Sequence, residues 1–212
     1  MPRIAEIEHT PNPNARKFIL REPLTFGVAR SYENAQQAQG DDLATRLFGN
    51  PHVTNLYYVD YWLTVTQDGQ ADWPDLLREI AVHIREAPAA EAESQKYAEA
   101  AQWLQRDDAE LSEADREKLE EIEDLLEAEV RPYLRSDGGD LYVVGLEDKQ
   151  LRVHYQGACG SCPSSLSGTL SHGSTAFSAL RGRPQFGARP DLRSGRECFI
   201  LLSECRAFRR ET

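Results

Sequence analysis

The segment "GACGSCP" places two thiols, Cys159 and Cys162, three positions apart. A C-x-x-C loop brings both sulfurs to one side of a tight turn, and Gly157 and Gly160 allow the backbone amides to approach them closely. Pro163 suits the first turn of a helix, whose positive end would lower the pKa of the thiols and favour thiolate. Because thiolate is needed for metal ligation and for disulfide chemistry alike, the motif leaves a metal site, a redox dithiol and an incidental pair open.

The number of ligands in the chain bears on this choice. An iron–sulfur cluster or a structural zinc ion takes four ligands, and the loop supplies two. The sequence holds no second C-x-x-C, and we interpret His154 and His172 as ordinary polar residues. Cys198 and Cys205, with the apolar "FILL" between them, could share one helix face, but we interpret them as unpaired thiols rather than ligands. A second copy of the loop would complete four sulfurs, which predicts a homodimer with the cofactor on its two-fold axis.

Composition excludes several classes of partner. With 24 basic and 35 acidic side chains the net charge is −11, which argues against nucleic acid, since phosphate binding needs a basic face. No apolar run reaches the roughly 20 residues of a membrane span, and the N-terminal residues lack the pattern of a secretory signal. We therefore expect a cytoplasmic protein. Four cysteines in 212 residues make a disulfide framework unnecessary for the fold.

The elements that position the thiols fall into two small α+β domains. Residues 1–86 show strand patterns at 17–20 and 61–67, a helix at 41–48, and a helix that begins at Asp72 as N-cap. Its apolar residues recur at helical spacing: Trp73, Leu76, Leu77, Ile80 and Ile84. Residues 87–111 are rich in Ala, Glu and Gln and read as an acidic linker.

The second domain, 112–181, begins with a helix. Ser112 and Asp115 resemble a capping box, and one apolar stripe follows, formed by Leu119, Ile122, Leu126, Val130 and Tyr133. After the "DGGD" turn we expect strands at 141–146 and 151–156, joined by a polar turn. The C-x-x-C loop thus leaves a strand and is expected to enter a helix at Pro163.

The segment from "LEEIEDLLEAEVRPYLRSDGGD" through the hairpin to "GACGSCPSS" resembles the C-terminal domain of NifU-like (Nfu-type) iron–sulfur cluster scaffold proteins. "HTPNPNARKFIL", "LFGNPHVTNLYYVDYWLTVT" and "DWPDLLREI" resemble the N-terminal domain of the longer members. The resemblance spans about 4–86 and 115–170. It implies Cys159 and Cys162 as ligands of a [4Fe-4S] cluster, with [2Fe-2S] as the alternative, bridged by two subunits and passed to apo-proteins. The resemblance implies that the N-terminal domain supplies no cluster ligands and contributes to partner recognition or stability.

The sequence departs from the family pattern after Leu170. Residues 171–212 hold eight Arg and four acidic residues, a net charge of +4, against −15 for residues 1–170. A helical stripe persists through Leu166, Leu170, Phe177 and Leu180, but residues 182–212 form an atypical tail with no convincing helix. A translated frameshift would explain this change, and the coding sequence in the neighbouring reading frame tests that hypothesis.

The sequence as a whole favours a non-enzymatic iron–sulfur scaffold or carrier whose partners are apo iron–sulfur proteins and upstream assembly proteins. One alternative is a thiol–disulfide oxidoreductase with Cys159 as nucleophile and Cys162 as resolving thiol; Ala158 stands where thioredoxin-type enzymes carry Trp. A second alternative is a structural zinc-binding module.

Overall fold

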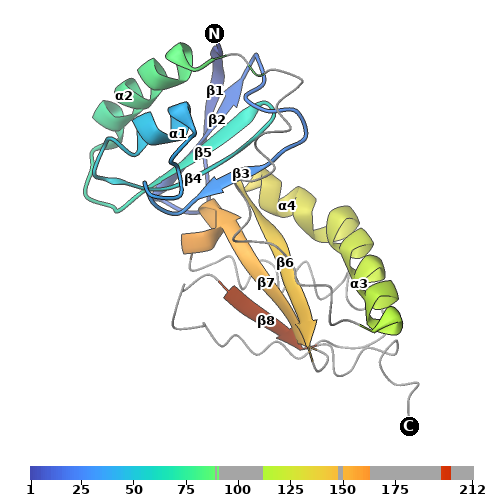
Figure 1. Ribbon diagram of the computed structural model, residues 1–212. Coiled ribbons are helices and arrows are strands. Elements are labelled where there is room, and N and C mark those ends of the chain that lie inside the picture. The colour runs from blue at the N-terminus through green and yellow to red at the C-terminus, as the bar shows by residue number, and fades with distance from the viewer. Residues whose placement is uncertain (89, 91–111, 148–149, 163–196, 202–212) are drawn as a thin grey trace. The chain divides into compact units, whose positions relative to one another are not determined.

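The computed structural model describes residues 1–88, 90, 112–147, 150–162 and 197–201 (Figure 1). The chain divides into two compact units, Met1–Trp103 and Leu104–Thr212, and each contains its own sheet with helices against it. The predicted α+β class is therefore confirmed. Most of the predicted linker lies outside the described residues. Within them, no helix has both the length and the apolar character of a membrane span.

The first unit is built on a five-stranded antiparallel sheet with the order β1-β2-β5-β4-β3. The predicted strands at 17–20 and 61–67 are confirmed as β2 and β5. Three further strands had no prediction: β1, the three-residue β3, and β4. The strands are β1 (Ile4–His9), β2 (Ala15–Leu20), β3 (Arg30–Tyr32), β4 (Val53–Val59) and β5 (Trp62–Gln67).

Two helices cover one face of this sheet, α1 (Asp42–Leu47) and α2 (Trp73–Glu86) (Figure 1). Asp41 caps α1, because its side chain accepts a hydrogen bond from the backbone N–H of Ala44. Asp72 stands at the predicted N-cap of α2 but makes no side-chain cap bond. The buried face of α2 packs in one core with inward-facing residues of the sheet: Leu76, Ile80, Ile84, Phe18, Leu56, Leu63 and Val65. Both predicted helices are thus confirmed.

The second unit begins with α3 (Glu113–Leu125), continues through a π-helical turn, η2 (Leu126–Val130), and ends its helical part with α4 (Arg131–Ser136). The N-cap half of the predicted capping box is confirmed: the Ser112 hydroxyl accepts from the backbone N–H of Asp115, and it also donates to the Asp115 carboxylate at 2.7 Å. The cap fixes where the helix starts and hence which face meets the sheet.

The predicted apolar stripe is right for four of its five members and wrong for Tyr133. Leu119, Ile122, Leu126 and Val130 are buried, whereas Tyr133 is 50% exposed and Leu134 is only 5% exposed. The cause is the turn η2, whose hydrogen bonds reach one residue further than in an α-helix and so rotate the following residues. Leu134, rather than Tyr133, therefore continues the buried face.

The second sheet has the order β6-β7-β8 and consists of β6 (Gly139–Glu147), β7 (Gln150–Gly157) and β8 (Glu197–Leu201). The predicted hairpin is confirmed as β6 and β7. The possibility that Cys198 lies on a helix is wrong, because residues 197–201 form a strand whose backbone pairs with β7, with Cys198 opposite Val153. Part of the atypical tail therefore completes the sheet. The predicted helix at Pro163, its stripe and Cys205 lie outside the described residues.

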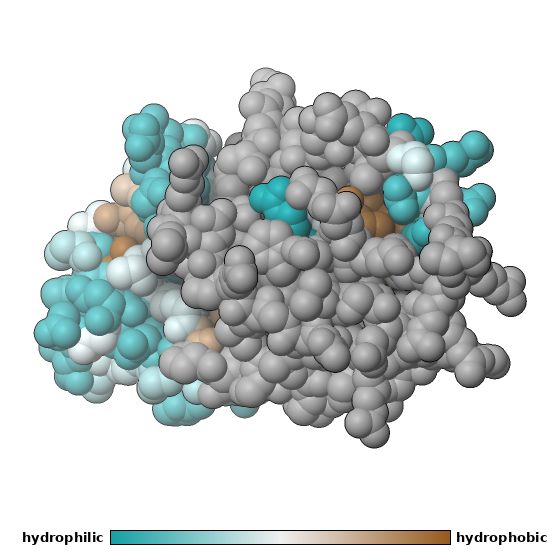
Figure 2. Space-filling model, turned by 90° about the horizontal axis from the view of Figure 1, so that it is seen from below, coloured by the Kyte–Doolittle hydropathy of each residue, from teal (hydrophilic) through white to brown (hydrophobic). Residues whose placement is uncertain are grey.

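The buried faces of the helices and of β6 and β7 form one core. It contains Leu119, Ile122, Leu126, Val130, Leu134, Leu141, Val143, Leu146, Leu151, Val153, Tyr155 and Cys159. On the face drawn in Figure 2, the described surface is mainly hydrophilic, with small apolar areas. Cys159, one of the two candidate thiols, is therefore a member of the hydrophobic core of the second unit.

Candidate functional site

The two cysteines follow directly from the end of β7. A short 3₁₀ turn, η3 (Ala158–Ser161), carries Cys159, and Cys162 is the residue that ends it. The backbone N–H of Cys162 donates to the carbonyl of Cys159 at 3.4 Å, so both thiols belong to one turn, and neither is in a disulfide. Cys159 is 5% exposed and Cys162 is partly buried. The loop thus joins one sulfur in the core to one nearer solvent.

Backbone geometry at two glycines sets the path of the loop. Gly157 has φ +64° and Gly138 has φ +82°, in the left-handed region where a side chain is strained. The carbonyl of Gly138 accepts from the backbone N–H of Ala158 at 3.1 Å and ties the loop to the end of α4. The predicted shaping role of Gly157 agrees with this geometry. Gly160 is not among the described residues with positive φ.

Gly139 is a site residue that the sequence reasoning missed. It pairs with Gly157 across the hairpin, and a Cβ built on it would stand 2.6 Å from Cys159 Sγ and 2.5 Å from the carbonyl oxygen of Gln156. Only a residue without a side chain allows Cys159 to pack there. The "GG" dipeptide was the available signal, but it indicated only a turn.

The electrostatic surroundings of Cys159 differ from those predicted. Burial raises the pKa of the Cys159 thiol, and the nearby Asp137, Cys162 and Asp140 raise it further. The predicted lowering of the pKa depended on a helix at Pro163, which lies outside the described residues. Within the part of the chain that the structure describes, the pKa of Cys159 is raised rather than lowered, because burial is the largest influence on it.

Asp140 is held in place beside the loop. It is buried, its Oδ2 accepts from Arg135 Nε at 3.0 Å, and its Oδ1 accepts from the backbone N–H of Leu141 at 2.8 Å. Arg135 also donates to Glu127 at 2.6 Å. The contact with Arg135 and the backbone hydrogen bond of Leu141 thus fix the Asp140 carboxyl group beside the thiols.

One chain offers a metal two thiols from this loop. Among the described residues, no group of three or more His, Cys, Asp or Glu side chains is arranged to hold a metal ion. His154, predicted to be an ordinary polar residue, is buried in β7, and His172 lies outside the described residues. The thiols are soft donors suited to iron, and they fit half of a four-sulfur ligand set.

Comparisons with known proteins match both halves of the chain. Residues 4–91 match the family "Scaffold protein Nfu/NifU N terminal", and residues 122–173 match the family "NifU-like domain". The human "NFU1 iron-sulfur cluster scaffold homolog, mitochondrial" is 31% identical over 166 residues, which are 76% of this chain and 61% of that protein. The Arabidopsis thaliana "NifU-like protein 4, mitochondrial" is 29% identical over 162 residues, 76% of this chain and 56% of that protein.

The chain spans a little over half the length of these curated relatives. A crystal structure of the Staphylococcus aureus protein SAV1430 matches 38% of this chain and 96% of its own with 21% identity and a TM-score of 0.34, which adds no evidence on the fold. With an Nfu/NifU N-terminal domain followed by a NifU-like domain, the chain belongs to the NifU-like (Nfu-type) family of iron–sulfur cluster scaffold proteins.

Proposed function

We propose that Cys159 and Cys162 from two copies of this chain hold one iron–sulfur cluster, of the [4Fe-4S] type, and pass it to apo-proteins. The observation that carries the proposal is the pair of thiols on η3 together with the lack of any three-donor group among the described residues. Such a cluster takes four cysteine sulfurs, and the loop of one chain supplies two. A two-fold axis beside the loop brings the other two from an identical surface.

The unequal burial of the two thiols suits a carrier. Cys162 is nearer solvent and is the sulfur that a cluster or a recipient's thiol meets first. Cys159 is buried in the core, where the protonated thiol is favoured because its pKa is raised. When a cluster leaves, Cys159 takes up a proton and remains as a neutral core residue. Cluster binding at Cys159 must therefore displace a proton from a buried thiol, which works against permanent retention.

The oxidoreductase alternative has less support. A nucleophilic cysteine works as thiolate and needs access to its substrate, and it is usually found where the pKa is lowered. Cys159, the predicted nucleophile, is 5% exposed and its pKa is raised. We therefore propose a non-enzymatic role. The alternative is a structural zinc ion bound by the same two sulfurs.

The proposed partners follow from the scaffold role. Upstream assembly proteins supply the cluster and apo iron–sulfur proteins receive it, while the N-terminal domain contributes to partner recognition or stability. A cytoplasmic location stays a prediction; the relatives named above are mitochondrial by name.

The test is anaerobic reconstitution of the full chain with iron and sulfide, followed by visible absorption, metal analysis and transfer to an apo-protein acceptor. We expect a brown protein with about four iron and four sulfide per two chains. The variant C159S/C162S should stay colourless, and the matched variant C198S/C205S, which removes the other two thiols, should load normally. Loading of C159S/C162S, or bound zinc in place of iron, would overturn the proposal.

A further inference from the structure

The N-terminal domain contains a pocket that cluster binding does not use. It has a volume of about 80 Å³ and lies between the start of α1, the end of α2 and strands β3 and β4. A single water needs about 10–15 Å³ of such space, so the pocket can admit the end of a side chain. Its lining combines charged and apolar groups, which suggests a specific ligand rather than a packing defect.

A buried ion pair forms one wall of the pocket. Asp41 Oδ2 accepts from Arg30 Nη1 at 2.7 Å, from the Tyr32 hydroxyl at 2.9 Å, and from the Tyr58 hydroxyl. Asp41 Oδ1 accepts from the backbone N–H of Ala44 at 3.0 Å. Burial alone would raise the pKa of Asp41, but these hydrogen bonds and the charge of Arg30 outweigh it and lower the pKa. The carboxylate is therefore ionised and fixed in orientation.

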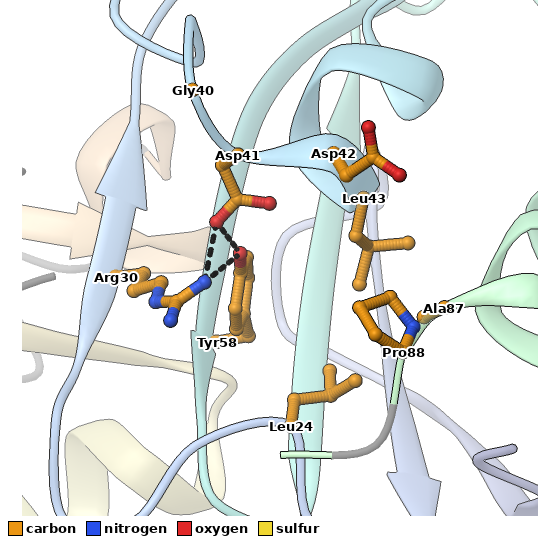
Figure 3. Close-up of a pocket in the computed structure, with 9 residues that line it drawn as sticks. All are labelled: Leu24, Arg30, Gly40, Asp41, Asp42, Leu43, Tyr58, Ala87 and Pro88. Atoms are coloured by element: carbon orange, nitrogen blue, oxygen red, sulfur yellow. Dashed lines mark hydrogen bonds and ion pairs between the residues drawn. The ribbon is translucent and has the colours of Figure 1, made fainter. Parts of the chain in front are cut away.

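This orientation presents the negative end of the ion pair to the pocket. In Figure 3, Arg30 and the Tyr58 hydroxyl lie on one side of the Asp41 carboxylate, and its other oxygen points to the side of Leu43 and Pro88. A carboxylate oxygen has two lone pairs, and Ala44 engages one of those on Oδ1. A donor that enters the pocket therefore meets Asp41 Oδ1. The hydrogen bonds of Asp41 to Arg30, Tyr32 and Tyr58 fix the position of this acceptor.

The remaining walls favour a cation on an apolar stem. Leu24, Leu43 and Pro88 line the side opposite the ion pair, and Asp42 lies at the rim with its side chain 83% exposed. Asp42 Oδ2 pairs with Arg46 at 2.8 Å. Residues 1–88 carry eight basic and twelve acidic side chains, so the domain as a whole also attracts a basic partner.

We propose that this pocket binds a lysine side chain of a partner protein, with the methylenes along Leu24, Leu43 and Pro88 and the ammonium at Asp41 Oδ1. The wall of three apolar residues covers the stem, the Asp41 carboxylate recognises the head, and the charge of Asp42 at the rim attracts the lysine as it enters. The site goes beyond cluster binding and does not depend on it, because no thiol takes part. It gives the N-terminal domain a recognition role with a stated chemistry.

The test uses N-acetyl-lysine methylamide as probe and the cluster-free full chain, with binding followed through the backbone amide NMR signals of Gly40, Leu43 and Ala87. We expect saturable shifts at these three residues in the millimolar range, as for a single side chain. N-acetyl-norleucine methylamide has the same stem without the charge and should cause no saturable shifts. Acetate serves as the anionic probe and should not bind.

Two charge reversals make a matched pair. Asp42→Lys should weaken lysine-probe binding about tenfold, because an attraction at the rim becomes a repulsion. Asp75→Lys makes the same change at a side chain that is 79% exposed and that also pairs with an arginine, Arg78, but lies outside the pocket. It should bind the probe like the unchanged chain.

Four outcomes would overturn the proposal. These are no saturable shift with the lysine probe, equal shifts with the norleucine probe, binding of acetate at the same amides, and equal weakening by the two reversals. The second would mean an apolar site, the third an anion site at Arg30, and the fourth a response to net charge alone. A dispersed amide spectrum of Asp42→Lys verifies that the variant is folded.

Discussion

Gly139→Ala isolates the contact between β6 and the cluster loop. The added Cβ would lie 2.6 Å from Cys159 Sγ, 2.9 Å from Cys159 Cβ and 2.5 Å from the carbonyl oxygen of Gln156. Favourable contacts between such atoms lie at roughly 3.5–4.0 Å, so Cys159 and the end of β7 must move by about 1 Å. Overpacking of this kind costs about 1–3 kcal/mol of unfolding free energy. The thiol that moves is one of the proposed ligands, so we expect cluster loading to fall as well.

Gly145→Ala is the matched control. It lies on the same strand, and a Cβ there would have no heavy atom within 4 Å. Replacing glycine by alanine where space and backbone allow it stabilises a protein by about 0.4–1 kcal/mol, because the unfolded chain loses freedom. The two variants should therefore change the unfolding free energy of the second domain with opposite signs.

The assay combines chemical unfolding of the full chain, followed at amide signals of the second domain, with iron content after anaerobic reconstitution. We expect Gly139→Ala to be destabilised and depleted in iron, and Gly145→Ala to match the unchanged chain in iron content. If both variants load iron equally and Gly139→Ala is not destabilised, the packing of Cys159 against Gly139 does not hold the loop.

Three further predictions concern the rest of the fold. Leu134→Ala should cost about 2–5 kcal/mol in unfolding free energy and Tyr133→Ala far less, which thermal unfolding would show; the reverse order would contradict the rotation at η2. Ser112→Ala should cost about 1 kcal/mol through loss of the cap of α3, and an unchanged unfolding midpoint would contradict this. The folded pKa of Asp41 lies below the unfolded value of about 3.9, so its stabilisation is complete above that pH and is lost as pH falls through the folded pKa. Asp41→Asn should therefore destabilise the N-terminal domain at neutral pH and flatten its acid unfolding curve, while Asp42→Asn should follow the unchanged chain.

Structural features that depend on residues close together in the sequence could be predicted. The cap at Ser112, the helix at 41–48 and the strands around a polar turn each depend on residues within a few positions of one another. The spacing of Cys159 and Cys162 is a local signal of the same kind, and it was enough to place both thiols on one turn. Their role as cluster ligands remains a prediction.

Features that depend on distant contacts could not be predicted. The rotation that exposes Tyr133 comes from a π-helical turn, for which the sequence gives no local signal. Gly139 meets Cys159 only because a hairpin of two strands brings them together. The direction of the Cys159 pKa shift depends on burial in the core, and the loop sequence alone indicated the opposite sign.

The pocket network is a further case of this kind. Arg30, Tyr32 and Tyr58 come from two strands and meet Asp41 at the start of a helix, so no window of sequence contains the set. β3 was missed because three residues are too few for a strand pattern, although its first residue, Arg30, lines the pocket.

The most direct test of the central claim is anaerobic native mass spectrometry of the reconstituted full chain. If Cys159 and Cys162 of two copies share one cluster, the mass of the cluster should occur only on the dimer, once per two chains. A mixture with C159S/C162S should yield no cluster on mixed dimers. A single chain that carries a whole cluster, or mixed dimers that carry one, would contradict the shared site.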